Sequence, residues 1–303
     1  MINSHPSLPE FDYIKLESLS EASQFLADHA NEARPLLGGT DIFVRMRDGI
    51  WKDKYLVDVK GLDGMDRISY DPSNGLTIGA SMNMNRVIIS PQVREHYQVL
   101  VEAARSVASY QLRNRATIVG NICNASPAGD TIGACLLLDG VLNVHGADGC
   151  MRQTPLASFF SGPGKTVLIP GDIVTSIQIP PPRRGLAGRY LKLGRNRLSD
   201  LAIVGVTVIG YPDDEAPSGY RIKLALASVA PVPLVVSQVE RILSEKPITE
   251  EGFLEAAQAA MGACTPIDDT RGSARYRKWM VRNLSLVALK EVWAKLQKLD
   301  LGG

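Results

Sequence analysis

The chain has 303 residues, and 33 lysines and arginines against 32 aspartates and glutamates give a formal net charge of +1, which excludes a general electrostatic field for nucleic acid or an acidic membrane. Hydrophobic residues at 45% and charged residues at 21% are typical of a folded globular protein, and no run of about 18 apolar residues predicts a transmembrane segment. The four cysteines form no C-x-x-C pair and no disulfide framework, so we expect a cytoplasmic protein with no metal site of its own.

Residues 1–58 are predicted to form a small α+β unit. A helix is expected over 21–30, with Ser20 as its N-cap. A short strand, the glycine turn 38–41 and a helix that stops at Gly49 follow.

Residues 59–180 are predicted to begin with two strands and a helix over 94–109, and to end in several short strands. Between them, the segment 110–140 is rich in Gly, Asn, Ser, Thr and Pro yet has few charges in its middle. Because loops that only meet water tend to carry more charge, we expect this segment to fold against something.

The proline-rich run 180–185 is the expected linker to a C-terminal α/β domain over 181–303, in which strands precede helices over 249–263 and 274–297. The last helix is expected to bury one apolar stripe, made of Tyr276, Met280, Leu284, Val287 and Ala288. A basic cluster near its start is expected on a surface that faces solvent or another subunit; its members are Arg271, Arg275, Arg277, Lys278 and Arg282.

The glycine turn has two interpretations. Adjacent Gly38 and Gly39 allow backbone N–H groups to point into one concavity at the positive end of a helix dipole, which suits a diphosphate. The alternative is an ordinary strand–helix turn with Thr40 or Asp41 as the N-cap. Asp41 would repel a phosphate, so it is expected to cap the helix or to bind a hydroxyl.

A second polar segment begins at Thr117 and continues to Asp130, just before a short predicted helix. Asp130 is either that helix's N-cap or a ligand-binding carboxylate, and both roles stay open. No G-x-G-x-x-G fingerprint follows a strand, no G-x-S-x-G elbow occurs, and the segment SGPGKT is an incomplete phosphate-binding loop that we interpret as a turn.

Taken together, LLGGTDIFVRMRDG and LRNRATIVGNICNASPAGDT resemble the FAD-binding subunit of the molybdenum hydroxylases. That family includes the medium subunit of carbon monoxide dehydrogenase and the flavin domain of xanthine dehydrogenase. The resemblance covers nearly the whole chain. It implies an α+β fold in which a two-lobed, PCMH-like FAD-binding part, with lobes 1–58 and 59–180, precedes a C-terminal CO-dehydrogenase-flavoprotein-like domain over 181–303 with a small antiparallel sheet and helices.

The resemblance also implies which residues bind FAD. Those along the diphosphate and nearby FAD are Leu37, Gly38, Gly39, Thr40, Asp41 and Ile42. Those of the second wall, in which Asp130 faces hydroxyls of FAD, are Ala116, Thr117, Gly120, Asn121, Cys123 and Asp130. Val107, Ala108 and Leu112 match positions that flank the cofactor. Ile173 and Val174 match residues near its adenine end, and Lys192 matches a lysine of the flavin pocket.

The implied activity is electron transfer without a catalytic acid, base or nucleophile on this chain. A large molybdenum-cofactor subunit and a small iron–sulfur subunit are the implied partners, in a heterotrimer or a dimer of heterotrimers, with NAD or another electron acceptor. We expect the iron–sulfur partner to approach through residues 121–130. The rival interpretations are a free-standing flavoprotein oxidoreductase and a scaffold subunit that has lost FAD. Only Val119, where the family often has glycine, supports the scaffold.

Overall fold

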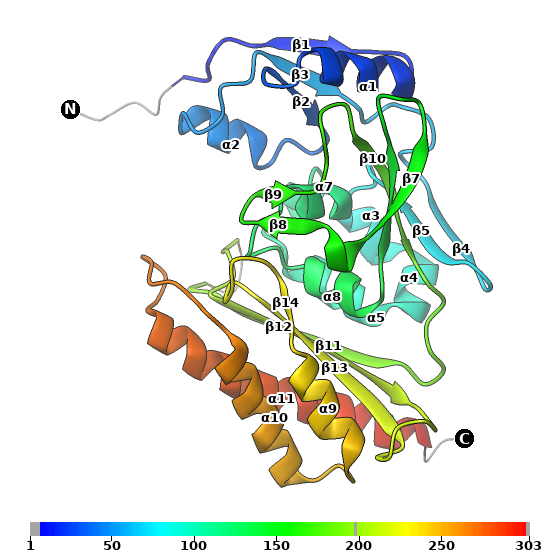
Figure 1. The fold of residues 1–303 in the computed structure, drawn as a ribbon, viewed down its shortest axis with the longest axis vertical. Coiled ribbons are helices and arrows are strands. Elements are labelled where there is room, and N and C mark those ends of the chain that lie inside the picture. The colour runs from blue at the N-terminus through cyan, green and yellow to red at the C-terminus, as the bar shows by residue number, and fades with distance from the viewer. Residues whose placement is uncertain (1–6, 197–198, 301–303) are drawn as a thin grey trace.

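The computed structural model of the chain describes residues 7–196 and 199–300. Three main sheets follow one another down the long axis of the molecule, from the N-terminal unit at the top of Figure 1 to the C-terminal helices at the bottom. Small sheets mixed with helices confirm the α+β class that the sequence predicts.

The first sheet is parallel and has its third strand in the centre. Parallel neighbours need crossover connections, which two helices provide here. In spatial order the strands are β1 (Asp12–Lys15), β3 (Tyr55–Asp58) and β2 (Ala33–Leu36), and the helices are α1 (Leu19–Asp28) and α2 (Ile42–Arg47).

The prediction that Ser20 caps the first helix is wrong. The helix starts at Leu19, and the N-cap is Ser18, whose hydroxyl accepts the Glu21 N–H. The Glu21 carboxylate in turn accepts the Glu17 N–H. This reciprocal pairing, close to a capping box, satisfies two backbone donors at once and fixes the start earlier than apolar spacing alone suggests.

The second sheet is antiparallel, with the strand order β4-β5-β10-β6-β7. Its strands are β4 (Ile68–Asp71), β5 (Gly75–Gly79), β6 (Val141–His145), β7 (Met151–Pro155) and β10 (Ile173–Ile179). The helices of this region are α3 (Met84–Ile89), α4 (Pro91–His96), α5 (Gln98–Ser106), α6 (Tyr110–Arg113), α7 (Ile118–Cys123) and α8 (Ile132–Leu137). A 3₁₀ turn, η1 (Leu156–Ser158), leads into a small hairpin of β8 (Phe160–Gly162) and β9 (Lys165–Thr166).

The single helix expected over 94–109 is also wrong, because the chain leaves the helical conformation at Tyr97, between α4 and α5. The Tyr97 side chain is fully buried, and its hydroxyl donates to the Pro180 carbonyl at 2.9 Å. This long-range hydrogen bond and the burial of the ring favour the break over continued helix.

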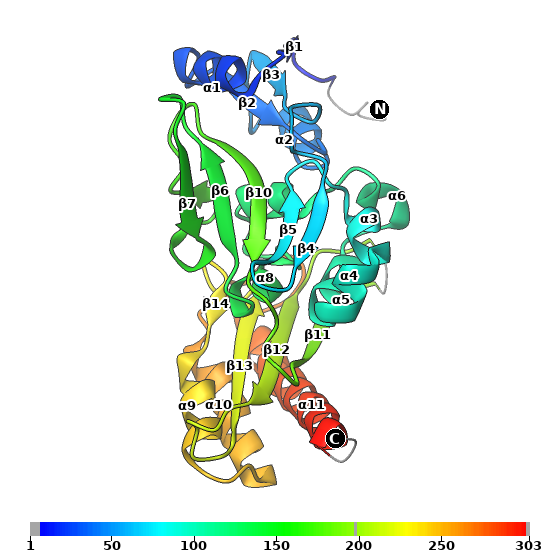
Figure 2. The ribbon, with the colours of Figure 1, turned by 90° about the vertical axis from the view of Figure 1, so that its right-hand side faces the viewer.

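The third sheet is antiparallel and consists of β11 (Ala187–Leu193), β12 (Val204–Pro212), β13 (Tyr220–Ala227) and β14 (Leu234–Val235). Helices α5 and α8 of the preceding unit contact β11, β12 and β13, and three C-terminal helices also pack on the sheet or on one another (Figure 2). These are α9 (Ser237–Glu245), which the sequence did not predict, α10 (Glu250–Ala263) and α11 (Ala274–Asp300). Because β12 is covered on both faces, every residue over 204–211 is buried.

The stripe predicted for the last helix is correct in part, because Ala288 is buried and Met280 and Leu284 pack on the core. Tyr276 and Val287 are 43% and 46% exposed, whereas Arg277 is 1% exposed. The Arg277 guanidinium donates to the Ile203 carbonyl at 2.8 Å and pairs with Asp269 at 2.6 Å. Arg277 therefore does not belong to a surface cluster, and Arg271, which precedes the helix, also pairs with Asp269.

Candidate functional site

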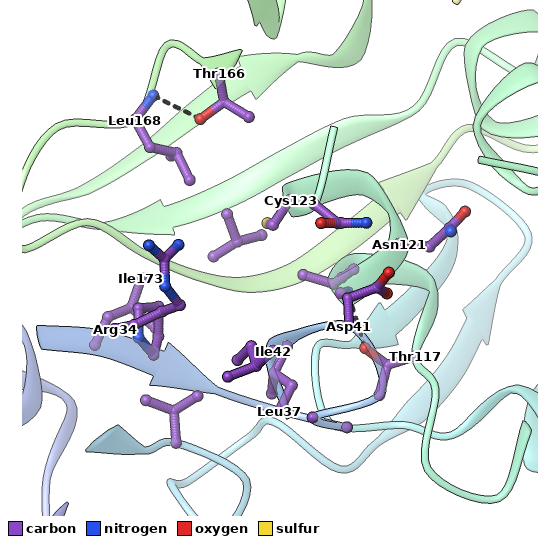
Figure 3. A pocket seen from close by; sticks show the side chains of 18 of the residues that line it. Arg34, Leu37, Asp41, Ile42, Thr117, Asn121, Cys123, Thr166, Leu168 and Ile173 are labelled. Carbon is purple, nitrogen blue, oxygen red and sulfur yellow. Dashed lines mark hydrogen bonds between the residues drawn. The ribbon is translucent and has the colours of Figure 1, made fainter. Parts of the chain in front are cut away.

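A cavity of about 460 Å³ lies between the N-terminal unit and the second unit (Figure 3). Three segments far apart in sequence form most of its wall, over residues 33–42, 107–124 and 164–174. Arg34, Asp41 and Asp172 are the ionisable side chains that line it, apart from the Cys123 thiol. The cavity thus offers mainly backbone, amide, hydroxyl and apolar groups to a ligand.

The glycine turn forms one wall of the cavity, and it also brings two backbone segments into direct contact. A Cβ atom on Gly38 would lie 2.2 Å from the Arg115 carbonyl oxygen, so no side chain fits there. Gly39 has φ +72°, in the left-handed region that favours glycine. The turn therefore depends on both glycines, and the strand–turn–helix prediction for this segment is confirmed.

The second loop forms the facing wall around the short helix α7. Thr117 caps the helix, and its hydroxyl accepts the Gly120 N–H at 2.8 Å. The Asn121 side-chain carbonyl accepts the Thr131 hydroxyl at 2.7 Å, which fixes the loop across its two ends. Val119 occupies a helical position in α7, so no left-handed backbone is required where the family often has glycine.

The beginnings of α2 and α7 both border the cavity. The first backbone N–H groups of a helix have no acceptor inside that helix. Asp41 lies at the N-cap position of α2 but makes no capping hydrogen bond. Desolvation raises the pKa of its carboxyl, against the opposing effects of Arg45 and of a hydrogen bond with Asn124. The Asn124 side-chain oxygen is buried without a partner, which leaves an acceptor at the cavity wall.

The third wall was predicted only in part, because Ile173 and Val174 were expected at the cofactor whereas Gly164 and Thr166 were not. The segment SGPGKT is the turn we predicted, but its hairpin also places Gly164 and Thr166 at the cavity, where the Gly164 N–H donates to the Ala125 carbonyl at 2.9 Å. Arg34 also lines the cavity; its guanidinium stacks 3.8 Å from the Trp51 ring centre and bonds Asp53 at 2.8 Å. No local motif marks these residues, because only the tertiary fold brings them together.

Most of the residues expected to bind the cofactor line this one cavity. They are Leu37, Gly38, Gly39, Thr40, Asp41, Ile42, Val107, Ala116, Thr117, Gly120, Asn121, Cys123, Ile173 and Val174. Figure 3 shows Asp41, Thr117 and Asn121 on one side of the view, and Arg34, Leu168 and Ile173 on the other. Ala108, Leu112, Asp130 and Lys192 lie outside the lining set.

Asp130 and Lys192 form a buried ion pair at 2.8 Å. The Asp130 carboxylate also accepts the Tyr190 hydroxyl at 2.6 Å, and the Lys192 ammonium donates to the Ser106 carbonyl at 3.0 Å. Desolvation raises the pKa of Asp130, against the opposing effect of Lys192, and burial raises that of Tyr190 well above its usual range. Thr131, not Asp130, lies at the N-cap position of α8, so the capping alternative is wrong.

The residues present fit FAD. A glycine-dependent turn, two helix starts and an orphan side-chain acceptor suit a ligand that has a diphosphate and hydroxyls, while the apolar lining suits ring systems. Within residues 7–196 and 199–300, no group of three His, Cys, Asp or Glu side chains is placed to hold a metal ion. The same residues contain no helix that is both long and apolar enough to span a bilayer.

Comparison with protein families agrees with this geometry. Residues 9–182 match the FAD binding domain in molybdopterin dehydrogenase, and residues 189–292 match the CO dehydrogenase flavoprotein C-terminal domain. The resemblance stated from the two loops is thereby confirmed.

Individual relatives are similar over almost their entire lengths. The carbon monoxide dehydrogenase medium chain of Hydrogenophaga pseudoflava is 30% identical, with 95% of this chain and 98% of that protein covered. The glyceraldehyde dehydrogenase medium chain of Sulfolobus acidocaldarius is also 30% identical, over 94% of this chain and 99% of that protein. Among solved structures, the Hydrogenophaga pseudoflava carbon monoxide dehydrogenase that lacks the Mo-pyranopterin moiety of the molybdenum cofactor superposes with a TM-score of 0.90 at 30% identity, covering 95% of this chain and 99% of that chain.

Proposed function

We propose that this chain holds FAD in the cavity between its two loops and passes electrons from partner iron–sulfur clusters to NAD or another acceptor. The chain belongs to the family of FAD-binding subunits of molybdopterin-dependent dehydrogenases, and this membership supports the proposal. The observation that carries this proposal is the convergence of both glycine-containing loops on one weakly charged cavity. When bound, FAD supplies the capacity to exchange electrons singly or in pairs.

The residues of this chain bind and orient the cofactor. The backbone around Gly38 and Gly39 would hold the diphosphate, and Asn124 and Asp41 would meet hydroxyl groups. Burial raises the pKa of the Cys123 thiol to about 12, which favours its protonated form at neutral pH. The roles of Asp130 beside FAD hydroxyls and of Lys192 in the flavin pocket stay predictions.

The partner arrangement is a proposal as well. Relatives named medium chains support a complex with a large molybdenum-cofactor subunit and a small iron–sulfur subunit, as a heterotrimer or a dimer of heterotrimers. Cytoplasmic location stays a prediction. Against the scaffold alternative stands Val119, which occupies an ordinary helical position. Against a free-standing enzyme stands the absence, among the lining residues, of a recognisable acid–base pair beside the cavity.

The proposal is tested by the flavin content of the purified chain after desalting, with Gly39→Ala as the variant and Gly49→Ala as its control. Both glycines have positive φ, +72° and +70°, so alanine strains both backbones by about 1 to 2 kcal/mol. Only Gly39 borders the cavity, where the added Cβ would meet Phe43 at 2.8 Å, whereas Gly49 has open space. An alanine-containing turn relaxes, and binding must restore the conformation that presents its N–H groups.

We expect the dissociation constant for FAD to rise about tenfold in Gly39→Ala and to stay unchanged in Gly49→Ala. A colourless wild-type chain that takes up no added FAD would refute the proposed function. Co-purification with large and small subunits separates the complex from a free-standing enzyme.

A further inference from the structure

A second hollow lies on the outer surface of α3 and α6, beside the end of α5. We call it the arginine hollow, because Arg86, Arg105 and Arg113 line it together with Ile89 and Tyr110. The lining includes no carboxylate. It is thus a surface of one charge sign on a chain whose overall charge is close to neutral.

The positive charge of the hollow is uncompensated. Across the described ranges, neither Arg86 nor Arg105 forms an ion pair. Arg113 is held in place by hydrogen bonds to the carbonyls of Val107 and Ala108, at 2.8 and 3.2 Å, and to the Asn85 side chain. Burial and the neighbouring Arg105 lower the pKa of Arg113. A fixed guanidinium with two free neighbours is prepared to receive an anionic group.

Large apolar side chains surround these charges. Ile89 is 68% exposed and Tyr110 is 62% exposed, and Leu112 on the same short helix as Tyr110 is 40% exposed. Tyrosine and arginine are the residue types that dominate protein–protein binding energy, and isoleucine and leucine add apolar area. This combination on one surface favours a protein ligand over a small anion.

The hollow also lies next to the cofactor cavity, although none of the described residues lines both. Met84 lines the cavity and its neighbour Asn85 lines the hollow, both from α3. Val107 lines the cavity, and its carbonyl accepts from Arg113. A protein bound at the hollow would therefore contact residues directly adjacent to those that line the cavity.

The segment expected to face the partner does not offer such a surface. Residues 121–130 include no exposed residue. The Pro127 carbonyl accepts the Ser228 N–H of the C-terminal domain at 2.7 Å, and the Ala125 carbonyl accepts from the hairpin. The arginine hollow is more exposed than this segment, whose residues are all buried or partly buried.

We propose that the arginine hollow docks the protein that delivers electrons to this chain, through a partner surface on which carboxylates stand beside apolar side chains. The inference rests on the proposed function, since it assumes a cofactor in the cavity and a separate electron donor. Charge complementarity selects an acidic partner, and the adjacency of the hollow to the cavity favours a short electron path. Steering by the arginines also makes docking dependent on ionic strength.

The test uses the native complex, isolated through a tag on this chain from cells that also produce its large and small subunits. The variants are Arg105→Glu and Tyr110→Ala, both at exposed positions. The matched controls are Arg275→Glu and Tyr276→Ala, an exposed arginine and tyrosine on α11 of the C-terminal domain. Three quantities are measured for each: iron–sulfur subunit retained per chain, FAD per chain, and the rate of flavin reduction after substrate is added.

We expect each variant at the hollow to reduce retention of the iron–sulfur subunit or the flavin reduction rate at least tenfold, with FAD content unchanged. The controls should match the wild type, and added salt should weaken the wild-type complex more than Arg105→Glu. Unchanged retention and reduction in both hollow variants would overturn the inference. The inference would also be overturned if the hollow variants kept the iron–sulfur subunit but had a higher KM for a pyridine-nucleotide acceptor, because the hollow would then bind a small anion. A wild-type chain without FAD would instead refute the proposed function, whatever the subunit retention.

Discussion

Replacing Lys192 by methionine tests the buried ion pair that joins the second loop to the C-terminal sheet. Asp130 is 6% exposed, and the Lys192 side chain is 13% exposed. Without the ammonium, the carboxylate keeps only the Tyr190 hydroxyl as a side-chain partner. Removal of one member of a buried pair costs about 3 to 5 kcal/mol, because the remaining charge stays desolvated. We expect Lys192→Met to lower the free energy of unfolding by this amount at pH 8.

The pKa of Asp130 determines in which direction the stability of Lys192→Met changes with pH. Desolvation already raises the pKa of Asp130, and loss of Lys192 removes the main opposing influence. A carboxyl whose pKa is higher in the folded state binds more protons there than in the unfolded state, so stability falls as pH rises from the unfolded pKa of about 3.9 to the raised folded pKa. Lys192→Met should therefore regain stability as the pH is lowered from 8 through that raised pKa towards about 3.9.

The assay is urea unfolding of the FAD-free chain at several pH values for Lys192→Met, Asp130→Asn and the double variant. Asp130→Asn removes the buried negative charge, so the double variant should be more stable than Lys192→Met alone. A cost for Lys192→Met below about 1 kcal/mol at pH 8, or no recovery at lower pH, would refute the reasoning.

Two further predictions concern buried groups elsewhere. Arg277→Met should lower the free energy of unfolding by about 1 to 3 kcal/mol, because the Ile203 and Ser228 carbonyls lose a donor while Asp269 keeps Arg271 as a partner. Arg275→Met on the exposed face should change it by less than about 0.5 kcal/mol in urea unfolding. An equal effect of the two would contradict that assignment. Alkylation of the native chain at pH 8, followed by mass spectrometry, should label exposed Cys150 first and leave buried Cys135 unlabelled, since burial raises the pKa of the Cys135 thiol to about 12. Rapid labelling of Cys135 would show that the second unit is open.

Local signals predicted the parts of the site that depend on a few consecutive residues. Gly38 and Gly39 between a strand and a helix indicate a turn that approaches another backbone, and the structure supplies that backbone at Arg115. The weak charge of the segment after Thr117 correctly indicated that it folds against other elements. In both cases the physical cause lies within the motif itself.

Elements decided by distant contacts could not be predicted in the same way. The break at Tyr97 follows from a hydrogen bond to Pro180, and the buried stripe of α11 includes Arg277, which no search for apolar periodicity would place inside. Arg34 and Gly164 line the same cavity only because the tertiary fold brings the first sheet and the β8–β9 hairpin together. Sequence patterns predict which face of an element is apolar, whereas the positions of these residues depend on contacts with other elements.

The size of the first hydrophobic core has a thermodynamic consequence. Between the first sheet and α2, the buried apolar side chains are Leu36, Met46 and Leu56, far fewer than in the other two cores. A molecule in the cavity touches this unit and the second unit at the same time, so its binding free energy adds RT ln(1 + [L]/Kd) to the association of the two. Occupancy of the cavity and closure of the N-terminal unit are therefore one linked equilibrium, and a mutation that shifts either must shift the other.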